Sequence, residues 1–119
     1  MKAIRVHEFG GIGSIRLDEI PRPVPEAGEV LVAVKAAGVG PWDRLVREGQ
    51  SDLGQALPLT LGSDISGTVA ALGTDVGVFA LGDAVYGATN DLFVGGYAEY
   101  ALVEASKVAR TLRGSLRPL

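Results

Sequence analysis

The amino-acid sequence has 119 residues, none of them cysteine and only one of them histidine, His7. Without cysteine the chain forms no disulfide, and zinc sites built from cysteine ligands are excluded. One histidine among scattered carboxylates does not supply the four ligands of a tetrahedral zinc site either. We therefore expect this chain to bind no metal, and in particular no zinc.

Long apolar runs and an excess of basic residues are also missing. Charged residues such as Lys35, Asp75 and Asp83 interrupt the apolar segments before they reach the length of a membrane span. The first residues show no signal-peptide pattern. A net charge of -3 and a pI of 5.0 argue against a binder of phosphate backbones, which needs a basic face. These absences predict a cytoplasmic protein that binds neither membranes nor nucleic acid.

Glycine is abundant, with 17 residues, and 47% of the residues are hydrophobic. Glycine at this density within valine-rich segments is typical of turns and bulges between short strands. The length is that of a single domain. Alternating or β-branched apolar segments predict strands over residues 3–6, 15–20, 29–37, 65–72, 84–86, 97–103 and 107–110.

Two of these segments also predict how the strands pack. Residues 15–20 alternate apolar and polar side chains, which predicts a half-buried strand. Residues 29–37 have the strongest strand pattern, with Val30, Val32 and Val34 on one face. Together the segments predict a mainly β fold, a small and partly open β-barrel with one short helix.

The helix is predicted to begin at Pro41, because proline suits the first helical turn. The carboxylate of Asp43 favours the positive end of the helix, and Gly49 suits a left-handed cap after its last turn. One apolar face of this helix is expected to pack on the barrel, at the i, i+3 and i+4 positions Trp42, Leu45 and Val46.

Six short segments follow one another along the chain: EFGG at 8–11, PEAGEVLV at 25–32, AGVGPWD at 37–43, LGSDISGTV at 61–69, LGDAVYG at 81–87 and GGYAEY at 95–100. In this order they resemble the N-terminal, GroES-like domain of medium-chain dehydrogenases/reductases, in particular the zinc-free quinone oxidoreductase branch. The resemblance covers about residues 1–110, which we predict to be one GroES-like domain. Residues 111–119 are predicted to be an irregular tail.

The resemblance implies an activity and a cofactor for the intact protein. Members of this branch use NADPH to reduce quinones or enones, and hydride leaves a nicotinamide that lies between this domain and a following Rossmann domain. A Rossmann domain holds the pyrophosphate with a G-x-G-x-x-G turn between a strand and a helix. The glycine cluster at 10–13 lacks the third glycine and precedes a predicted strand. We therefore expect a truncated, catalytic-side domain that is inactive alone and does not bind NADPH tightly.

Four positions depart from the zinc-dependent relatives. Those enzymes carry cysteine where this chain has Gly40, and histidine and glutamate where it has Ser63 and Asp64. Trp42 occupies the position of the serine or threonine that relays a proton in them. The resemblance therefore implies a substrate pocket but identifies no catalytic side chain.

The pocket is expected at the junction between the 29–37 strand and the helix, where the family places nicotinamide and substrate. The candidate pocket residues are Gly40, Pro41, Trp42, Asp43, Leu45, Tyr86 and Asn90. Each functional interpretation has a structural alternative. The alternative for Asp43 is a helix-start carboxylate, and the alternative for Trp42 is a core residue. Strand tyrosines such as Tyr86 are more often packing residues, and Asn90 fits a turn equally well.

A second function stays open on the sequence alone, that of a stand-alone GroES-like binding or assembly module without catalysis. Such a module needs a mobile apolar loop, and residues 51–60 are the candidate segment. For either function, the face that would meet a Rossmann domain is expected to be apolar. Its exposure predicts self-association through that interdomain face.

Overall fold

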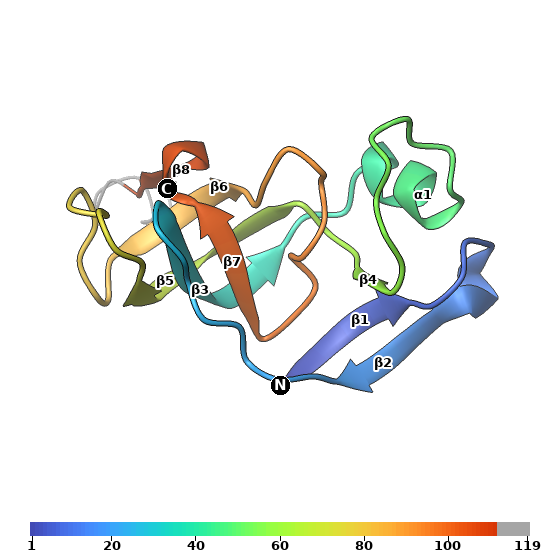
Figure 1. Ribbon diagram of the computed structural model, residues 1–119, viewed down its shortest axis with the longest axis horizontal. Helices are drawn as coiled ribbons and strands as arrows, with labels where there is room; N and C mark the ends of the chain where they lie inside the picture. Colours follow the sequence, from blue (N-terminus) through green and yellow to red (C-terminus); the bar gives the residue numbers. More distant parts are fainter. Residues whose placement is uncertain (112–119) are drawn as a thin grey trace, which may run out of the picture.

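The computed structural model describes residues 1–111 and arranges them in two antiparallel β-sheets with one α-helix (Figure 1). The small sheet has the order β2-β1-β4, and the large sheet the order β7-β3-β5-β6-β8. The small sheet comprises β1 (Lys2–Val6), β2 (Ile15–Glu19) and β4 (Leu59–Thr60). The large sheet comprises β3 (Glu29–Ala37), β5 (Asp64–Leu72), β6 (Ala84–Ala88), β7 (Tyr100–Glu104) and β8 (Val108–Arg110). The mainly β architecture with open sheets and one helix, α1 (Pro41–Arg47), is as predicted.

The core of the large sheet forms around β3, which pairs with β5 on one side and β7 on the other. Val30 and Val32 are completely buried, as the alternating pattern predicts. Gly67 of β5 faces β3 so closely that a Cβ atom there would lie 2.0 Å from the carbonyl oxygen of Ala33. The core cluster consists of Val30, Val32, Ile65, Val69, Val85, Ala101 and Val103.

The helix α1 packs beside the small sheet, not on the large one (Figure 1). Val46 is its buried apolar residue, and it forms a second cluster with Val6, Leu59 and Leu61. The chain leaves the helix through Gly49, whose φ of 74° is the left-handed conformation predicted for this glycine. The helix is therefore attached to β1 and β4, and its first turn follows directly from the end of β3.

Strand β2 differs from its prediction. The alternating pattern of residues 15–20 predicts a half-buried strand, but Leu17 is 64% exposed and Ile15 is also exposed. The reason is its position, because β2 is an edge strand whose only neighbour is β1. The alternation is present in the sequence, but the described residues leave Ile15 and Leu17 exposed.

The strand predicted over residues 97–103 begins later, at Tyr100. Before that point the chain connects the two sheets. The amide of Tyr97 donates to the carbonyl of Leu61 at 2.7 Å, and Ala98 forms an isolated bridge with Ala3 of β1. The residues before Tyr100 thus carry side chains to the boundary between the sheets, where α1 also begins.

The predicted tail, residues 111–119, lies outside the described residues apart from Thr111. Thr111 donates its amide to the carbonyl of Ala84, which extends the pairing of β8 with β6. Within residues 1–111 no helix has the length and hydropathy needed to span a bilayer.

Candidate functional site

The junction between β3 and α1 is an open backbone segment with a fixed carboxylate beside it. Gly40 precedes the helix with extended backbone, φ -127° and ψ 173°, and its amide donates to Oδ2 of Asp43 at 2.8 Å. This is the helix-start role that the sequence suggested for Asp43. A Cβ atom at Gly40 would have no heavy atom within 4 Å, so the space in front of this residue is open.

Tyr97 holds this junction from the other side. Its hydroxyl lies 2.8 Å from Oδ2 of Asp43 and 2.9 Å from the carbonyl oxygen of Gly38. The hydroxyl proton of Tyr97 thus has two possible acceptors. One is at the start of the open segment 38–40, and the other is in the helical turn that follows it. The ring of Tyr97 lies against Gly62, where a Cβ atom would come within 2.3 Å of the ring. In the sequence, Tyr97 belongs to a predicted strand and to the GGYAEY segment, and neither pattern reveals this role.

The electrostatics of this pair follow from burial. Asp43 is only 9% exposed, and its second oxygen, Oδ1, has no hydrogen-bond partner among the described residues. Burial, together with the hydrogen bond to the Asp43 carboxylate, raises the pKa of Tyr97 well above the usual value for tyrosine. The Tyr97 hydroxyl therefore stays protonated and serves as a hydrogen-bond donor.

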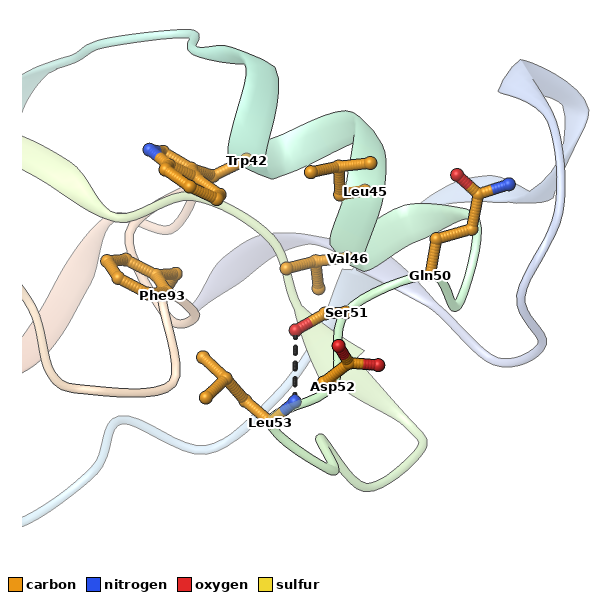
Figure 2. Close-up of a pocket in the computed structure, with 8 residues that line it drawn as sticks. All are labelled: Trp42, Leu45, Val46, Gln50, Ser51, Asp52, Leu53 and Phe93. Carbon is orange, nitrogen blue, oxygen red and sulfur yellow. Dashed lines mark hydrogen bonds between the residues drawn. The ribbon is translucent and has the colours of Figure 1, made fainter.

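A pocket of about 370 Å³ opens beside α1, and Trp42, which follows the junction in the chain, is one of its lining residues (Figure 2). This volume lies in the range of small-molecule sites, roughly 300–1,000 Å³. Side chains from the helix and from two loops line it, and most of them are apolar. The lining residues are Trp42, Leu45, Val46, Gln50, Ser51, Asp52, Leu53 and Phe93.

Two aromatic rings form one wall of the pocket. Trp42 and Phe93 stack with centroids 5.6 Å apart and an interplanar angle of 11°. Figure 2 shows the two rings face to face at one end of the pocket, with Leu45, Val46 and Leu53 lining the part next to them. Trp42 is 56% exposed, so its prediction as a core residue of the helix is wrong. The core position of α1 belongs to Val46 alone, because Trp42 projects toward the loop that carries Phe93.

Phe93 adopts an uncommon backbone conformation that its loop maintains. Its φ is 58°, in the left-handed region that side chains other than glycine rarely occupy. Asn90 braces the turn: its Oδ1 accepts from the amide of Leu92 at 3.0 Å, and its Nδ2 donates to the carbonyl of Val94 at 2.9 Å. Asn90 is thus a turn residue in this structure, and it fixes where the ring of Phe93 lies.

The two loops of the pocket are joined by Gln55. Its Nε2 donates to Oγ of Ser51 at 3.0 Å and to the carbonyl of Leu92 at 2.9 Å. Residues 51–55 are therefore held against the loop of residues 90–94. This arrangement uses the 51–60 segment, named above as a candidate mobile loop, to close one side of the pocket.

The structure brings together some of the predicted site residues and separates others. Trp42 and Leu45 line the pocket, and Gly40, Pro41 and Asp43 lie at the neighbouring junction. Asn90 is not one of the lining residues, but it bonds to Leu92 and Val94, the neighbours of the lining residue Phe93. Tyr86 lies on β6, 54% exposed, and is not among them either. The lining loop 50–53 and Phe93 were missed, because neither segment carries a motif.

The positions that bind zinc in zinc-dependent relatives have other residues here, as described above. Ser63 is buried, and its Oγ has no hydrogen-bond partner within residues 1–111. Asp64 is exposed at the start of β5, where its Cβ would lie 3.4 Å from a Cβ added to Gly38. In this part of the chain no group of three or more His, Cys, Asp or Glu side chains is placed to hold a metal ion.

Comparison with known proteins places this site in a family. The alcohol dehydrogenase GroES-like domain family matches residues 26–113. The chain belongs to this family. The matched region includes both parts of the site, the β3–α1 junction and the loops that close the pocket.

Individual members of the GroES-like family support the quinone oxidoreductase branch. The chain is 44% identical to the quinone oxidoreductase of Lama guanicoe over 103 residues, which are 86% of this chain and 31% of that protein. The quinone oxidoreductase of Coxiella burnetii superposes with a TM-score of 0.88 at 33% identity, over 95% of this chain and 37% of that one. The Escherichia coli quinone oxidoreductase complexed with NADPH superposes with a TM-score of 0.88 at 26% identity, over 98% of this chain and 35% of that one.

The chain spans about a third of the length of the curated relatives it matches. The shared part is their GroES-like domain, as the six sequence segments indicated. Trp42, Asp43 and Tyr97 all lie within it.

Proposed function

We propose that this domain forms the substrate side of an NADPH-dependent reductase that acts on quinones or enones without zinc. The apolar pocket with its stacked Trp42 and Phe93 wall, next to an open backbone segment, is the observation that carries the proposal. Similarity to quinone oxidoreductases supports the reaction, and the NADPH complex of one structural neighbour supports the cofactor. The described domain alone is expected to be inactive.

The nicotinamide fits the open segment 38–40. In front of Gly40 no atom occupies the space of a side chain, so a flat ring can lie directly on the backbone there. When bound, NADPH supplies the hydride that reduces the substrate. Tyr97 keeps the segment in position by binding the carbonyl of Gly38 and the carboxylate of Asp43. The described residues hold half of such a site, since they contain no glycine-rich strand–turn–helix for the pyrophosphate.

The pocket fits a flat, apolar substrate. Trp42 and Phe93 offer ring faces for stacking, which adds about 0.5–1.5 kcal/mol beyond the burial of apolar surface. Leu45 and Leu53 complete an apolar surface, and Asp52 is the one charged residue among those that line the pocket. Such a site is expected to bind a neutral quinone weakly in this domain and to exclude water from one face of the quinone ring.

The absence of zinc in this proposal rests on the side chains at the equivalent positions. Gly40 offers no ligand atom, and Ser63 and Asp64 replace a histidine and a glutamate. Polarisation of the substrate carbonyl must then come from hydrogen-bond donors or from the cofactor side. The resemblance identifies no catalytic side chain, and the proposal assigns none to the pocket.

A titration of Trp42 fluorescence with a small neutral quinone tests the proposal. Trp42 is the only tryptophan, so its emission reports on this pocket alone. We expect saturable quenching that is lost in Phe93→Ala and retained in Tyr86→Phe, a substitution on β6 away from the pocket. Quenching that rises linearly with quinone in the unmodified chain would reject the pocket as a substrate site.

A further inference from the structure

The edge strand β2 presents an unpaired backbone with exposed apolar side chains. It is the outermost strand of the small sheet, at the edge of the molecule opposite β4 (Figure 1). Leu17 is 64% exposed, and Ile12 just before the strand is 78% exposed. Edge strands of this kind pair with other strands unless something blocks them.

The hydrogen-bond phase of β1 and β2 shows which groups point outward. Met1 and Ile20 exchange both of their backbone hydrogen bonds, so bonded pairs recur at every second position from there. The bonded pairs are then Ala3 with Asp18 and Arg5 with Arg16. Leu17 lies opposite Ile4 between them, in a pair that is not hydrogen-bonded. In agreement, the amide and carbonyl of Ile4 bond on the opposite side of β1, to Tyr97 and Leu61.

The amides and carbonyls of Leu17 and Glu19 therefore point away from β1. None of the described residues bonds to the outward backbone groups of Leu17. In an added antiparallel strand, residues whose amide and carbonyl point toward β2 must lie opposite Leu17 and Glu19. The possible registers of that strand therefore differ from one another by two residues.

The side chains of β2 select one register for a second copy of the same strand. When Leu17 pairs with Leu17 of the second copy, Arg16 lies opposite Asp18, and this pair occurs twice by symmetry. The Asp18 carboxylate also contacts His7 at 2.6 Å and Arg5 at 3.8 Å within its own chain, so Arg16 of the second copy would join an existing charge cluster. Registers centred on Arg16 or on Asp18 place like charges opposite each other, which destabilises a strand pair. The favoured register also brings the two exposed Leu17 side chains together.

We propose that the chain forms a two-fold symmetric dimer by antiparallel pairing of β2 with β2 of a second copy. The two small sheets then become one six-stranded sheet, with Leu17 on the symmetry axis. The pairing is isologous, so the same surface serves both partners. The proposal does not depend on the reductase function.

Proline substitution tests the backbone bonds. Leu17→Pro removes an amide that points away from β1, so the β1–β2 pairing is retained and the edge strand tolerates the change. We expect the dissociation constant of the dimer, measured by sedimentation equilibrium, to rise about tenfold or more. Circular dichroism verifies the fold. A folded Leu17→Pro variant that dimerises like the unmodified chain overturns the proposal.

A charge exchange tests the register. Arg16→Glu alone and Asp18→Lys alone each place like charges opposite each other, so each protein should dimerise about tenfold more weakly. Mixed together they restore two opposite-charge pairs and should form a heterodimer. Lys35→Glu, an equal charge change on β3 of the large sheet, should leave the dissociation constant unchanged. Failure of the mixture to recover dimers, with both variants folded, argues against this register.

A single cysteine locates the axis, because the chain has none of its own. Opposed residues in a bonded pair have Cα atoms about 5.5 Å apart, within disulfide reach. We expect Leu17→Cys to cross-link to itself under mild oxidation, and Glu19→Cys, which lies opposite Ile15, not to do so. Equal cross-linking of both variants overturns the proposal. Hydrogen exchange of the Leu17 amide gives a further check. Protection of this amide that does not depend on protein concentration also overturns the proposal, because it would mean that a segment of the same chain pairs with β2.

Discussion

The hydroxyl of Tyr97 and the Oδ2 atom of Asp43 lie 2.8 Å apart, although 54 positions separate the two residues in the sequence. The contact joins the segment that enters β7 to the first turn of α1. Because the same hydroxyl reaches the carbonyl of Gly38, it fixes both ends of the open segment proposed to meet the nicotinamide. The shape of the site therefore depends on a residue that lines no part of the Trp42 pocket.

Replacement of Tyr97 by phenylalanine should destabilise the domain. The buried Asp43 carboxylate would keep the amide of Gly40 but lose its second donor, at a cost of about 1–3 kcal/mol. Chemical denaturation followed by circular dichroism measures the difference in the free energy of unfolding. Tyr86→Phe, a change of the same atom on an exposed strand tyrosine, should stay within about 0.5 kcal/mol. Equal effects of the two substitutions would mean that the Tyr97 contact contributes nothing.

The raised pKa of Tyr97 predicts a loss of stability at alkaline pH. The folded state holds the phenol proton to higher pH than the unfolded chain, whose tyrosines ionise at about pH 10. Stability from this group is complete below that pH and decreases above it, since only the unfolded state then releases the proton. The difference in unfolding free energy between the unmodified chain and Tyr97→Phe should therefore shrink between neutral pH and the region above pH 10. A constant difference would contradict the burial argument.

Asn90 is expected to affect ligand binding through the loop that it braces. Asn90→Ala removes the bonds that hold Leu92 and Val94, and so releases Phe93 from its left-handed conformation. Quinone affinity, measured by Trp42 quenching, should fall about threefold to tenfold, while the unfolding free energy falls by about 1 kcal/mol. Asp91→Ala, in the same loop but pointing to Lys107, serves as the control and should retain affinity.

Metal and cofactor binding by the chain provide a further check. We expect elemental analysis of the purified chain to show no stoichiometric zinc, because it lacks cysteine and has one histidine. Calorimetry should show that NADPH binds with a dissociation constant above about 1 μM, which corresponds to about -8 kcal/mol, since residues 1–111 contain no G-x-G-x-x-G turn between a strand and a helix for the pyrophosphate. One tightly held zinc per chain would contradict the proposed zinc-free reaction.

Most of the strands and the helix could be predicted from the sequence, because glycine and β-branched patterns act locally. The exception is β4, Leu59–Thr60, which lies within the 51–60 segment predicted to be a loop. The buried Val30 and Val32 follow from alternation alone, as does the left-handed Gly49 from its place after the helix. The alternation of β2 was misleading, because a local pattern does not say whether a neighbouring layer exists.

The site was only partly predictable, for a related reason. Trp42 has the helical spacing of a core residue, and nothing local shows that Phe93 turns toward it. The contact of Tyr97 with Asp43 depends on the chain crossing between the sheets before β7, which is a property of the whole topology.

The decisive substitution for the proposed site is Gly40→Leu. The extended conformation of Gly40 suits any residue, and a Cβ atom there meets nothing within 4 Å, so the variant should fold. A leucine before the helix is a poorer cap than glycine, with an expected loss of about 1 kcal/mol. In the titration no nicotinamide is bound in front of Gly40, so a quinone ring that contacts Trp42 can extend into this open space. The leucine side chain would fill the same space.

We therefore expect Gly40→Leu to lose saturable quenching of Trp42 by small quinones, with circular dichroism unchanged. Gly77→Leu is the matched control, because it adds the same side chain to open space in a loop remote from α1. If the folded Gly40→Leu variant binds quinone as well as Gly77→Leu does, the ring does not approach the backbone at this junction. Binding would then be confined to the Trp42 and Phe93 wall, and the segment 38–40 would serve only to connect β3 to the helix.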